Sequence, residues 1–483
     1  MEKFMEKSDI ERFDHYVSEL FDNSGCPGIA VCIRGPKGII YDRGFGKRSL
    51  RSGLAVDGDT VMGLASLSKS FTTLALAILE SEQKVSFDDP VYKYFPSFKV
   101  PGTPSDLVTL RHLAMHTAGI PPIQPLEWSI AMNSTETENE WHKAMVASAP
   151  NKMNTIDQII DYISAGDYGH EGYTTLGQPG EYMSYSNEGY ALLSYVVDQV
   201  ADMPLEDFLK ERIFEPLGMT RTVLDLDGGE ARILSGGNIT SLFEKDADGK
   251  LIEDDDFSVL PPFRGCACMK STAHDITKYY KMLCDGGMWE GVQAIPAYAV
   301  DALVGRGFAA GKFPTYCYGI KKRTFAGKII GEHTGALHGT STAAGFVEGG
   351  YSAAVLCNLG EMDPDPFIWA AYNLILGLPP ETDQYLFDPI DREFSDPEAL
   401  TGDFLAAEGQ PSLVKVSLRD GHPVADYAGT PVRLLYCGNS RFSAVSDDEN
   451  KKRVNTLEFF IRGAGAWAVR CGSRIYRRME NKS

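Results

Sequence analysis

The sequence predicts an α+β fold in which helices flank an antiparallel sheet, followed by an all-β region near the C-terminus. β-prone runs occur at both ends of the first 380 residues, and the segment between them shows mostly helical apolar spacing. Sheets often combine strands that are distant in the chain, so we expect the early and late runs to pair. After residue 396, short strand patterns follow at regular spacing, which is typical of a small antiparallel barrel or sandwich.

The chain of 483 residues is long enough for two or more domains. We expect a main domain at residues 1–380, with a helical subdomain at about 110–215, and an all-β domain at residues 397–483. Residues 381–396 join them. This segment is rich in acidic residues, contains Pro389 and is flanked by Pro379, Pro380 and Pro397, a composition that is typical of a linker.

Apolar spacing and turn residues locate the individual elements. A helix is expected at the N-terminus because apolar residues from Ile10 to Leu20 recur at helical spacing. Gly35-Pro36-Lys37-Gly38 is a turn signal that joins two β-prone runs into a hairpin. The other elements expected in the first domain are helices at 68–82, 188–200, 205–213 and 272–285 and strands at 28–33, 38–44, 328–333, 343–347 and 353–358. In the last domain the expected strands are 414–418, 431–436, 441–445, 456–462, 467–471 and 474–479.

Charge excludes some classes of partner. The formal net charge is −20, and it is uneven: residues 392–483 carry +2, whereas residues 1–391 carry −22. A field of that sign repels polyphosphates and anionic lipids, so neither nucleic acid nor a membrane surface is an expected partner.

Three features indicate a cytoplasmic protein. The first 19 residues lack the apolar stretch of about 7 to 15 residues that a signal peptide needs. No run approaches the roughly 18 apolar residues of a membrane span. The nine cysteines are an odd number in apolar or strand-like contexts, which favours reduced thiols over a disulfide framework.

The segment Ser66-Leu67-Ser68-Lys69 is a candidate for nucleophilic chemistry. If Ser66 opens a helix, Ser66 and Lys69 share one face of it. A neutral amine nearby can accept the proton of a serine hydroxyl, and N–H groups at the helix start favour a developing oxyanion. The same spacing at Ser81 and Lys84 is interpreted as solvated surface, because no apolar run follows it.

Two further motifs follow in order: Tyr185-Ser186-Asn187 within residues 179–190, and His333-Thr334-Gly335 just before a strand. With Ser66-x-x-Lys69, and with flanking phrases at 110–120 and 214–219, the chain resembles the serine β-lactamase and penicillin-binding-protein superfamily. It is most similar to the class C-like branch, which includes esterases and D-aminopeptidases. The resemblance covers about residues 20–360 and implies a transpeptidase-like antiparallel sheet flanked by helices.

The resemblance implies a role for each motif residue. Ser66 is then the acylated nucleophile, and Lys69 and Tyr185 exchange its proton, although the sequence does not decide which of them is the primary base. Asn187 then binds the substrate amide and orients Lys69. The N–H groups of Ser66 and Ala336 form the oxyanion hole beside Gly335 and Thr334.

His333 departs from many lactamases, which carry lysine in this position to hold a substrate carboxylate. A histidine is mostly neutral at pH 7 and weakens such a clamp. The histidine form looks more like the D-aminopeptidases and esterases of the superfamily.

No metal or cofactor is expected. His112 and His116 have helical metal-ligand spacing but lack the glutamate of zinc proteases, and we interpret them as structural. Cys266 and Cys268 lie too close together for a usual zinc pair, with no second pair nearby.

The last 92 residues resemble the lipocalin-like barrel that is appended to some D-amino-acid-specific peptidases of the superfamily. In such relatives the barrel narrows the cleft or mediates assembly, so a homo-oligomer is allowed for. The sequence therefore favours a serine hydrolase acting on a small molecule or short peptide, as a D-amino-acid-specific peptidase or amidase or an esterase. A β-lactamase or D,D-carboxypeptidase is the alternative, and a non-catalytic ligand-binding protein of the same fold is a further one.

Overall fold

The computed structural model describes residues 6–134, 140–170, 172–246, 248–309, 314–384, 388–408, 412–427, 429–446 and 455–479. The chain divides into two compact units, each made of two separate stretches of sequence. Unit 1 contains Met1–Asp89 and Tyr190–Gln384, and unit 2 contains Pro90–Gly189 and Tyr385–Ser483.

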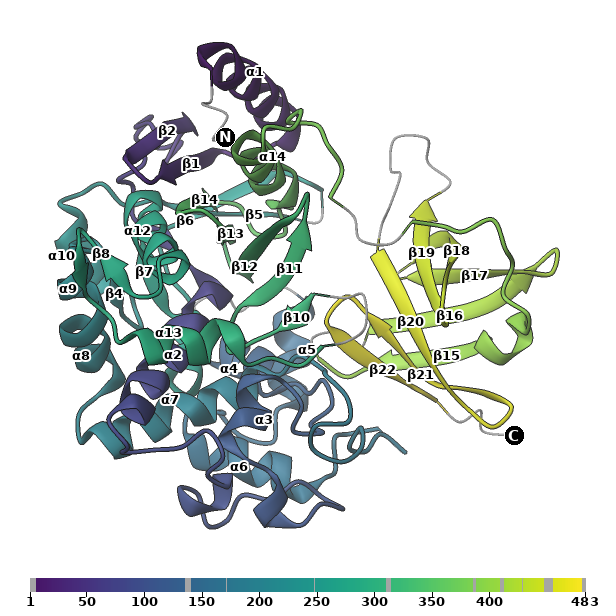
Figure 1. The fold of residues 1–483 in the computed structure, drawn as a ribbon. Coiled ribbons are helices and arrows are strands. Elements are labelled where there is room, and N and C mark those ends of the chain that lie inside the picture. The colour runs from purple at the N-terminus through teal and green to yellow at the C-terminus, as the bar shows by residue number, and fades with distance from the viewer. Residues whose placement is uncertain are drawn as a thin grey trace. The chain divides into compact units, whose positions relative to one another are not determined.

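Unit 1 is built on a seven-stranded antiparallel sheet (Figure 1), with the strand order β10-β11-β12-β13-β14-β1-β2. One pairing within this sheet joins β1 (Gly28–Gly35) to β14 (Tyr351–Cys357), with Ile29 opposite Cys357. The other strands are β2 (Gly38–Gly46), β10 (Thr315–Tyr316), β11 (Lys321–Phe325), β12 (Lys328–Leu337) and β13 (Thr340–Val347). This arrangement confirms the expected fold class, including the pairing of early with late strands.

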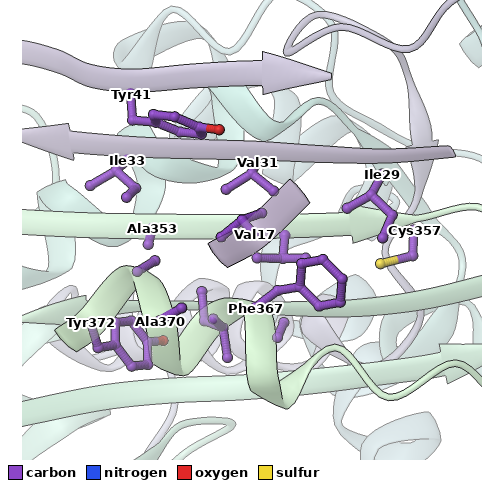
Figure 2. Close-up of a cluster of buried hydrophobic side chains, with 14 of the residues drawn as sticks. Val17, Ile29, Val31, Ile33, Tyr41, Ala353, Cys357, Phe367, Ala370 and Tyr372 are labelled. Carbon is purple, nitrogen blue, oxygen red and sulfur yellow. The ribbon is translucent and has the colours of Figure 1, made fainter. Parts of the chain in front are cut away.

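One face of this sheet carries the main hydrophobic core (Figure 2). Ile29, Val31 and Ile33 of β1 point to this face and pack with residues of two helices, α1 (Lys7–Ser24) and α14 (Asp365–Leu376). Val17 comes from α1 and Phe367 from α14, and both are buried. Successive side chains of β1 point to opposite sides of the sheet, and all but Arg34 are buried. Both faces of this strand are therefore covered.

The opposite face of the sheet packs against α12 (Ala273–Cys284). Cys32 lies between the inward residues of β1, and its Sγ lies 3.7 Å from Thr277 Oγ1 of this helix. The same layer contains α2 (Ser68–Ser81), in which every residue from Ser68 to Leu79 is buried. A helix that is buried on all sides belongs to the core, and α2 therefore provides a firm base for its own first turn.

The remaining elements of unit 1 are short. Strands β3 (Met62–Gly63), β7 (Met269–Ser271) and β4 (Val223–Leu224) form a small sheet, in the order β3-β7-β4. Two hairpins pair β5 (Leu242–Lys245) with β6 (Leu251–Asp254) and β8 (Met288–Trp289) with β9 (Val292–Gln293). The other helices are α7 (Asn187–Ala201, which begins in unit 2), α8 (Leu205–Leu209), a π-helical turn (Lys210–Phe214), α9 (Glu215–Leu217), α10 (Gly229–Ser235), α11 (Arg264–Ala267) and α13 (Ala297–Gly305).

Unit 2 combines four helices with a closed barrel. The helices are α3 (Leu110–Ala114), α4 (Pro125–Asn133), α5 (Glu140–Ser148) and α6 (Ile156–Ala165). The eight strands are β15 (Gly402–Ala406), β16 (Ser412–Arg419), β17 (His422–Tyr427), β18 (Thr430–Gly438), β19 (Arg441–Ser446), β20 (Asn455–Arg462), β21 (Gly465–Cys471) and β22 (Arg474–Arg478). Pairing of Phe404 with Arg478 closes the barrel between its first and last strands.

The barrel confirms the all-β region but contains two strands that the sequence patterns missed. β15 holds Gly402 and Asp403, and β17 holds Pro423, residue types that are depleted in strands. Their alternating inward residues, such as Phe404 and Ala425, nonetheless enter the barrel core. Burial of that face therefore outweighs weak local propensity in both strands.

Two properties of the whole chain bear on the sequence expectations. The structure holds all nine cysteines as free thiols. Among the residues described, no helix has both the length and the apolar character needed to cross a lipid bilayer.

The core in Figure 2 makes a testable prediction. Phe367→Ala removes a buried ring from the contact between α14 and the sheet, and is expected to reduce the free energy of unfolding of unit 1 by roughly 3–5 kcal/mol. Ile233→Ala is the matched control, because Ile233 is 80% exposed and its truncation is expected to change stability by no more than about 0.5 kcal/mol. Chemical denaturation of both variants measures the difference. Equal midpoints would show that Phe367 does not support the core.

Candidate active site

Ser66 lies in a short 3-10 turn, Ala65–Leu67, immediately before α2. Ala65 has a φ of 47°, in the left-handed region that residues with a side chain adopt only when their surroundings hold them there. The surroundings here are hydrogen bonds from Ser68 Oγ to Ala65 O (2.6 Å) and from Leu64 N to Met269 O (2.9 Å). The turn therefore presents Ser66 from a fixed backbone.

Lys69 is fully buried and lies one helical turn beyond Ser66. Its Nζ donates to Ser66 Oγ at 3.0 Å and to the carbonyl oxygen of Cys266 at 3.2 Å, and lies 5.7 Å from the ring centroid of Tyr190. An amine at hydrogen-bond distance from a hydroxyl can exchange a proton with it directly. The geometry expected from the sequence spacing of Ser66 and Lys69 is present.

Strand β12 runs close beside this turn at Gly335. A Cβ atom at Gly335 would lie 2.4 Å from Leu64 O and 3.0 Å from Ser66 N, closer than side chains approach backbone atoms. Thr342 of β13 donates its Oγ1 hydrogen to Leu64 O at 3.1 Å and links the sheet to the same turn. Only glycine at 335 allows the strand and the turn that carries Ser66 to approach this closely.

β12 is longer than the sequence pattern predicted. It continues through Thr334, Gly335 and Ala336, which pair with β13, whereas its ladder with β11 ends at Glu332. Thr334 is half-buried and Ala336 is exposed. The motif His333-Thr334-Gly335 is thus part of a strand segment that lies beside Ser66 and is paired with β13.

His333 is buried inside the sheet rather than exposed as a cation. Its Nδ1 lies 2.6 Å from the carbonyl oxygen of Thr334, so Nδ1 carries the hydrogen, and its Nε2 then accepts from Tyr316 Oη at 3.0 Å. Burial, together with the charges of Lys321 and Lys69, holds the pKa of His333 well below its ordinary value of 6.5. The imidazole is therefore neutral at neutral pH.

Tyr185 and Asn187 belong to unit 2, so they are described apart from Ser66 and Lys69. Both are buried, and Asn187 is the first residue of α7. The ring of Tyr185 packs against the ring of His116, with 4.2 Å between centroids, and His116 Nδ1 accepts from Ser186 N at 3.1 Å. Nδ1 of His112 accepts from Thr109 N at 3.2 Å, which accounts for the second histidine of that pair as well.

The sequence reasoning missed two barrel residues that contact the tyrosine motif. Arg474 places its guanidinium carbon 4.9 Å from the ring centroid of Tyr185, and Glu408 accepts from Asn187 Nδ2 at 3.1 Å. Neither residue stands in a recognisable motif, because the contacts arise only when the barrel packs within unit 2. The one local signal was the clustering of arginine near the C-terminus, at 470, 474, 477 and 478.

Buried carboxyl groups surround the same barrel residues. Burial raises the pKa of Glu188 to about 7, and the nearby carboxylate of Glu408 adds to the effect. Burial and Glu408 also raise the pKa of Glu127 well above its ordinary range. Both glutamates therefore hold protons more tightly than exposed glutamates do.

One group in unit 1 has the residue types of a metal site. Ligand atoms of Cys32, Asp42 and His274 lie within 4.8 Å of one another. The histidine, however, already contacts two carboxylates at 2.9 Å, Asp42 through Nε2 and Asp59 through Nδ1. Contacts of both ring nitrogens with carboxylates explain its position without a metal.

Comparison with known proteins identifies the family. The model of the Beta-lactamase family matches residues 13–377, which is most of the chain. The chain belongs to the Beta-lactamase family. The family assignment agrees with the resemblance drawn from the three motifs, and with the sheet and helices of unit 1.

Curated relatives match only in part. Penicillin-binding protein 4* of Bacillus subtilis is 30% identical over 184 residues, which is 38% of this chain and 35% of that protein. A beta-lactamase of Providencia stuartii is 23% identical over 229 residues, 47% of this chain and 50% of that protein. The chain thus matches about a third to a half of the length of these relatives.

Solved structures share the fold over more of the chain. The octameric penicillin-binding protein homologue from Pyrococcus abyssi has a TM-score of 0.66 at 22% identity, covering 97% of this chain and 99% of that one. SurE gives 0.68 at 19% identity, covering 98% and 99%. D-amino acid amidase from Ochrobactrum anthropi SV3 gives 0.57 at 19% identity, covering 76% and 97%. At such identities the likeness shows the fold alone.

The close approach at Gly335 predicts a sensitive position. Gly335→Ala places a methyl group against Leu64 O and Ser66 N, so the turn that carries Ser66 has to shift. We expect the rate at which a fluorophosphonate labels Ser66 to fall by about a hundredfold. Gly305→Ala is the control, because a Cβ there meets nothing within 4 Å. Equal labelling rates for the two variants would contradict the inferred contact.

The neutral state of His333 predicts a dependence of stability on pH. Its folded pKa is depressed, so the unfolded chain binds the proton first, and stability is lost as pH falls below about 6.5. This loss amounts to at most about 1.4 kcal/mol for each pH unit. His333→Gln removes it, so the fall in melting temperature from pH 7 to pH 5 should be smaller than in the wild type. His15→Gln, at a side chain that is 77% exposed, should leave that fall unchanged, whereas parallel profiles for all three proteins would exclude this role for His333.

Proposed function

We propose that this chain is a serine hydrolase that cleaves small amides or esters through an acyl-enzyme on Ser66. The observation that carries the proposal is the 3.0 Å contact between Ser66 Oγ and Nζ of the fully buried Lys69. This pair lies at the start of the buried helix α2 and beside strand β12. A serine nucleophile needs a base at hydrogen-bond distance, and Lys69 is placed to be that base.

The proposed reaction has two halves. Ser66 Oγ attacks the carbonyl carbon as its proton passes to Lys69 or Tyr185, and the N–H groups of Ser66 and Ala336 stabilise the oxyanion. The C–N or C–O bond then breaks, and the leaving group takes a proton from the same acid. Water attacks the acyl-enzyme in the second half and releases the acid product and free Ser66. Asn187 binds the substrate amide.

The preferred substrates are short D-amino-acid-containing peptides, their amides, and small esters. Two observations support this choice over penicillin-type substrates. The imidazole of His333 is buried and neutral, so it offers no fixed charge for a carboxylate, and residues 1–391 carry a net charge of −22. A D-amino acid amidase is among the proteins with this fold. Turnover of a cephalosporin without cleavage of D-aminoacyl substrates would favour the β-lactamase or D,D-carboxypeptidase alternative.

The proposal also covers the cellular location, the domains and the assembly of the chain. We infer a cytoplasmic enzyme, with residues 1–380 as the hydrolase domain, 381–396 as a linker and 397–483 as the barrel domain. A homo-oligomer is part of this proposal, supported by the octameric homologue from Pyrococcus abyssi. Mass photometry of the purified chain measures the oligomeric state directly.

Covalent labelling tests the proposed nucleophile. A fluorophosphonate is expected to add one adduct to the chain, located at Ser66 by peptide mass spectrometry, and Ser66→Ala should abolish it. Ser81→Ala is the matched control, since Ser81 starts the second copy of the same four-residue spacing, and it should label normally. An adduct that persists in Ser66→Ala would remove Ser66 from the mechanism. A panel of D- and L-aminoacyl p-nitroanilides, p-nitrophenyl esters and a chromogenic cephalosporin then ranks the substrates by kcat/KM.

A further inference from the structure

The hairpin that joins β21 and β22 of the barrel reaches the segment that carries Tyr185. Within unit 2, Tyr185 N donates to the carbonyl oxygen of Ser473 at 2.8 Å, and Ile475 N donates to Ser184 Oγ at 3.2 Å. Both hydrogen bonds use backbone atoms of the hairpin, so they fix the position of the backbone at Ser184 and Tyr185.

Two charged barrel residues continue this contact to the side chains of the motif. Arg474 lies over the Tyr185 ring and forms a two-pronged ion pair with Glu408, through Nε to Oε2 and through Nη2 to Oε1 at 2.6 Å. The same Oε1 of Glu408 accepts from Asn187 Nδ2 at 3.1 Å. Tyr185, Arg474, Glu408 and Asn187 therefore form one continuous chain of contacts.

Electrostatics make this pair costly to break. Burial alone would lower the pKa of Arg474, but the ion pair with Glu408 outweighs it and raises that pKa. Removing the guanidinium would leave the Glu408 carboxylate unpaired beside two buried glutamates, Glu127 and Glu188. A two-pronged arginine–carboxylate pair fixes the relative orientation of the two side chains in addition to the distance between them.

An apolar cluster anchors the same hairpin independently of these charges. Leu176 and Tyr182, which precede the motif, pack with side chains of the barrel, and the ring of Tyr182 lies 5.3 Å from that of Trp467. Arg477 holds the interface at another point by donating to the carbonyl oxygen of Thr175 at 2.6 Å. Loss of the Arg474–Glu408 pair would therefore disturb the motif without detaching the barrel.

We propose that Arg474 and Glu408 are positioning residues for the Tyr185–Asn187 motif in the hydrolysis described above, so that the barrel completes the catalytic machinery. The inference rests on the proposed function. Arg474 fixes the tyrosine ring, and Glu408 orients the amide of Asn187.

A double-mutant cycle tests this role. Arg474→Met is expected to lower kcat about tenfold with a smaller change in KM, and to have less than about a twofold effect in a Tyr185→Phe background. Arg474→Lys should recover part of the loss, because it keeps the positive charge. Arg477→Met is the matched control on the same strand, and should retain wild-type kcat. Equal effects of Arg474→Met in both backgrounds, or equal effects of Arg474→Met and Arg477→Met, would overturn the proposal.

A second readout needs no substrate. In protein labelled with ¹³C at the tyrosine ring, the Tyr185 signal is identified by its loss in Tyr185→Phe. That signal should move in Arg474→Met and stay in place in Arg477→Met, when each spectrum is recorded below the melting temperature of the variant. An unmoved signal would refute the positioning role even if the chain proved inactive on every substrate tested. Failure of Ser66 to label would instead refute the proposed function.

Discussion

The close approach between strand β12 and the turn that carries Ser66 is the constraint on which unit 1 depends. The strand can lie there only because Gly335 has no side chain, and the turn can lie there only because Ala65 accepts a left-handed backbone. Neighbouring elements fix this turn: Thr342 of the main sheet donates a hydrogen bond to Leu64 O, and Leu64 N donates one to Met269 O of the small sheet. Local backbone strain of this kind persists when the surrounding packing fixes it.

Charge is distributed differently in the two sets of candidate residues. The residues around Ser66 include a fully buried lysine and a neutral histidine, whose partners are a hydroxyl and backbone carbonyls. The residues around Tyr185 include the Arg474–Glu408 ion pair and two glutamates with raised pKa values. In the proposed mechanism, the first set supplies the nucleophile and the second supplies acid–base chemistry within a network of ionisable groups.

Local sequence patterns were enough to predict contacts between residues that are close in the chain, and the pairing of apolar runs. Ser66 and Lys69 are three residues apart, on a 3-10 turn and on the helix α2 that follows it, and the pairing of β1 with β14 followed from apolar runs at the two ends of the first domain. Contacts made only by tertiary packing were not predictable. Tyr316 of β10 binds His333 of β12 although β11 lies between these strands, and Glu408 and Arg474 reach the tyrosine motif from a different segment of the chain. Apart from the clustering of arginine near the C-terminus, the residues flanking these positions form no recognisable motif.

The pairing of Ile29 with Cys357 also bears on the order in which the protein acquires its structure. Strand β1 leaves the ribosome before its inner partner β14, from which it is separated by more than 300 residues of the chain. Contacts of such long range are slow to form, and an unpaired apolar strand is prone to aggregate while it waits. The hairpin of β1 and β2 therefore stays without its inner neighbour until β14 has been synthesised. In the barrel, by contrast, each strand pairs with the next one in sequence, and only the closing pair of β15 with β22 joins distant strands.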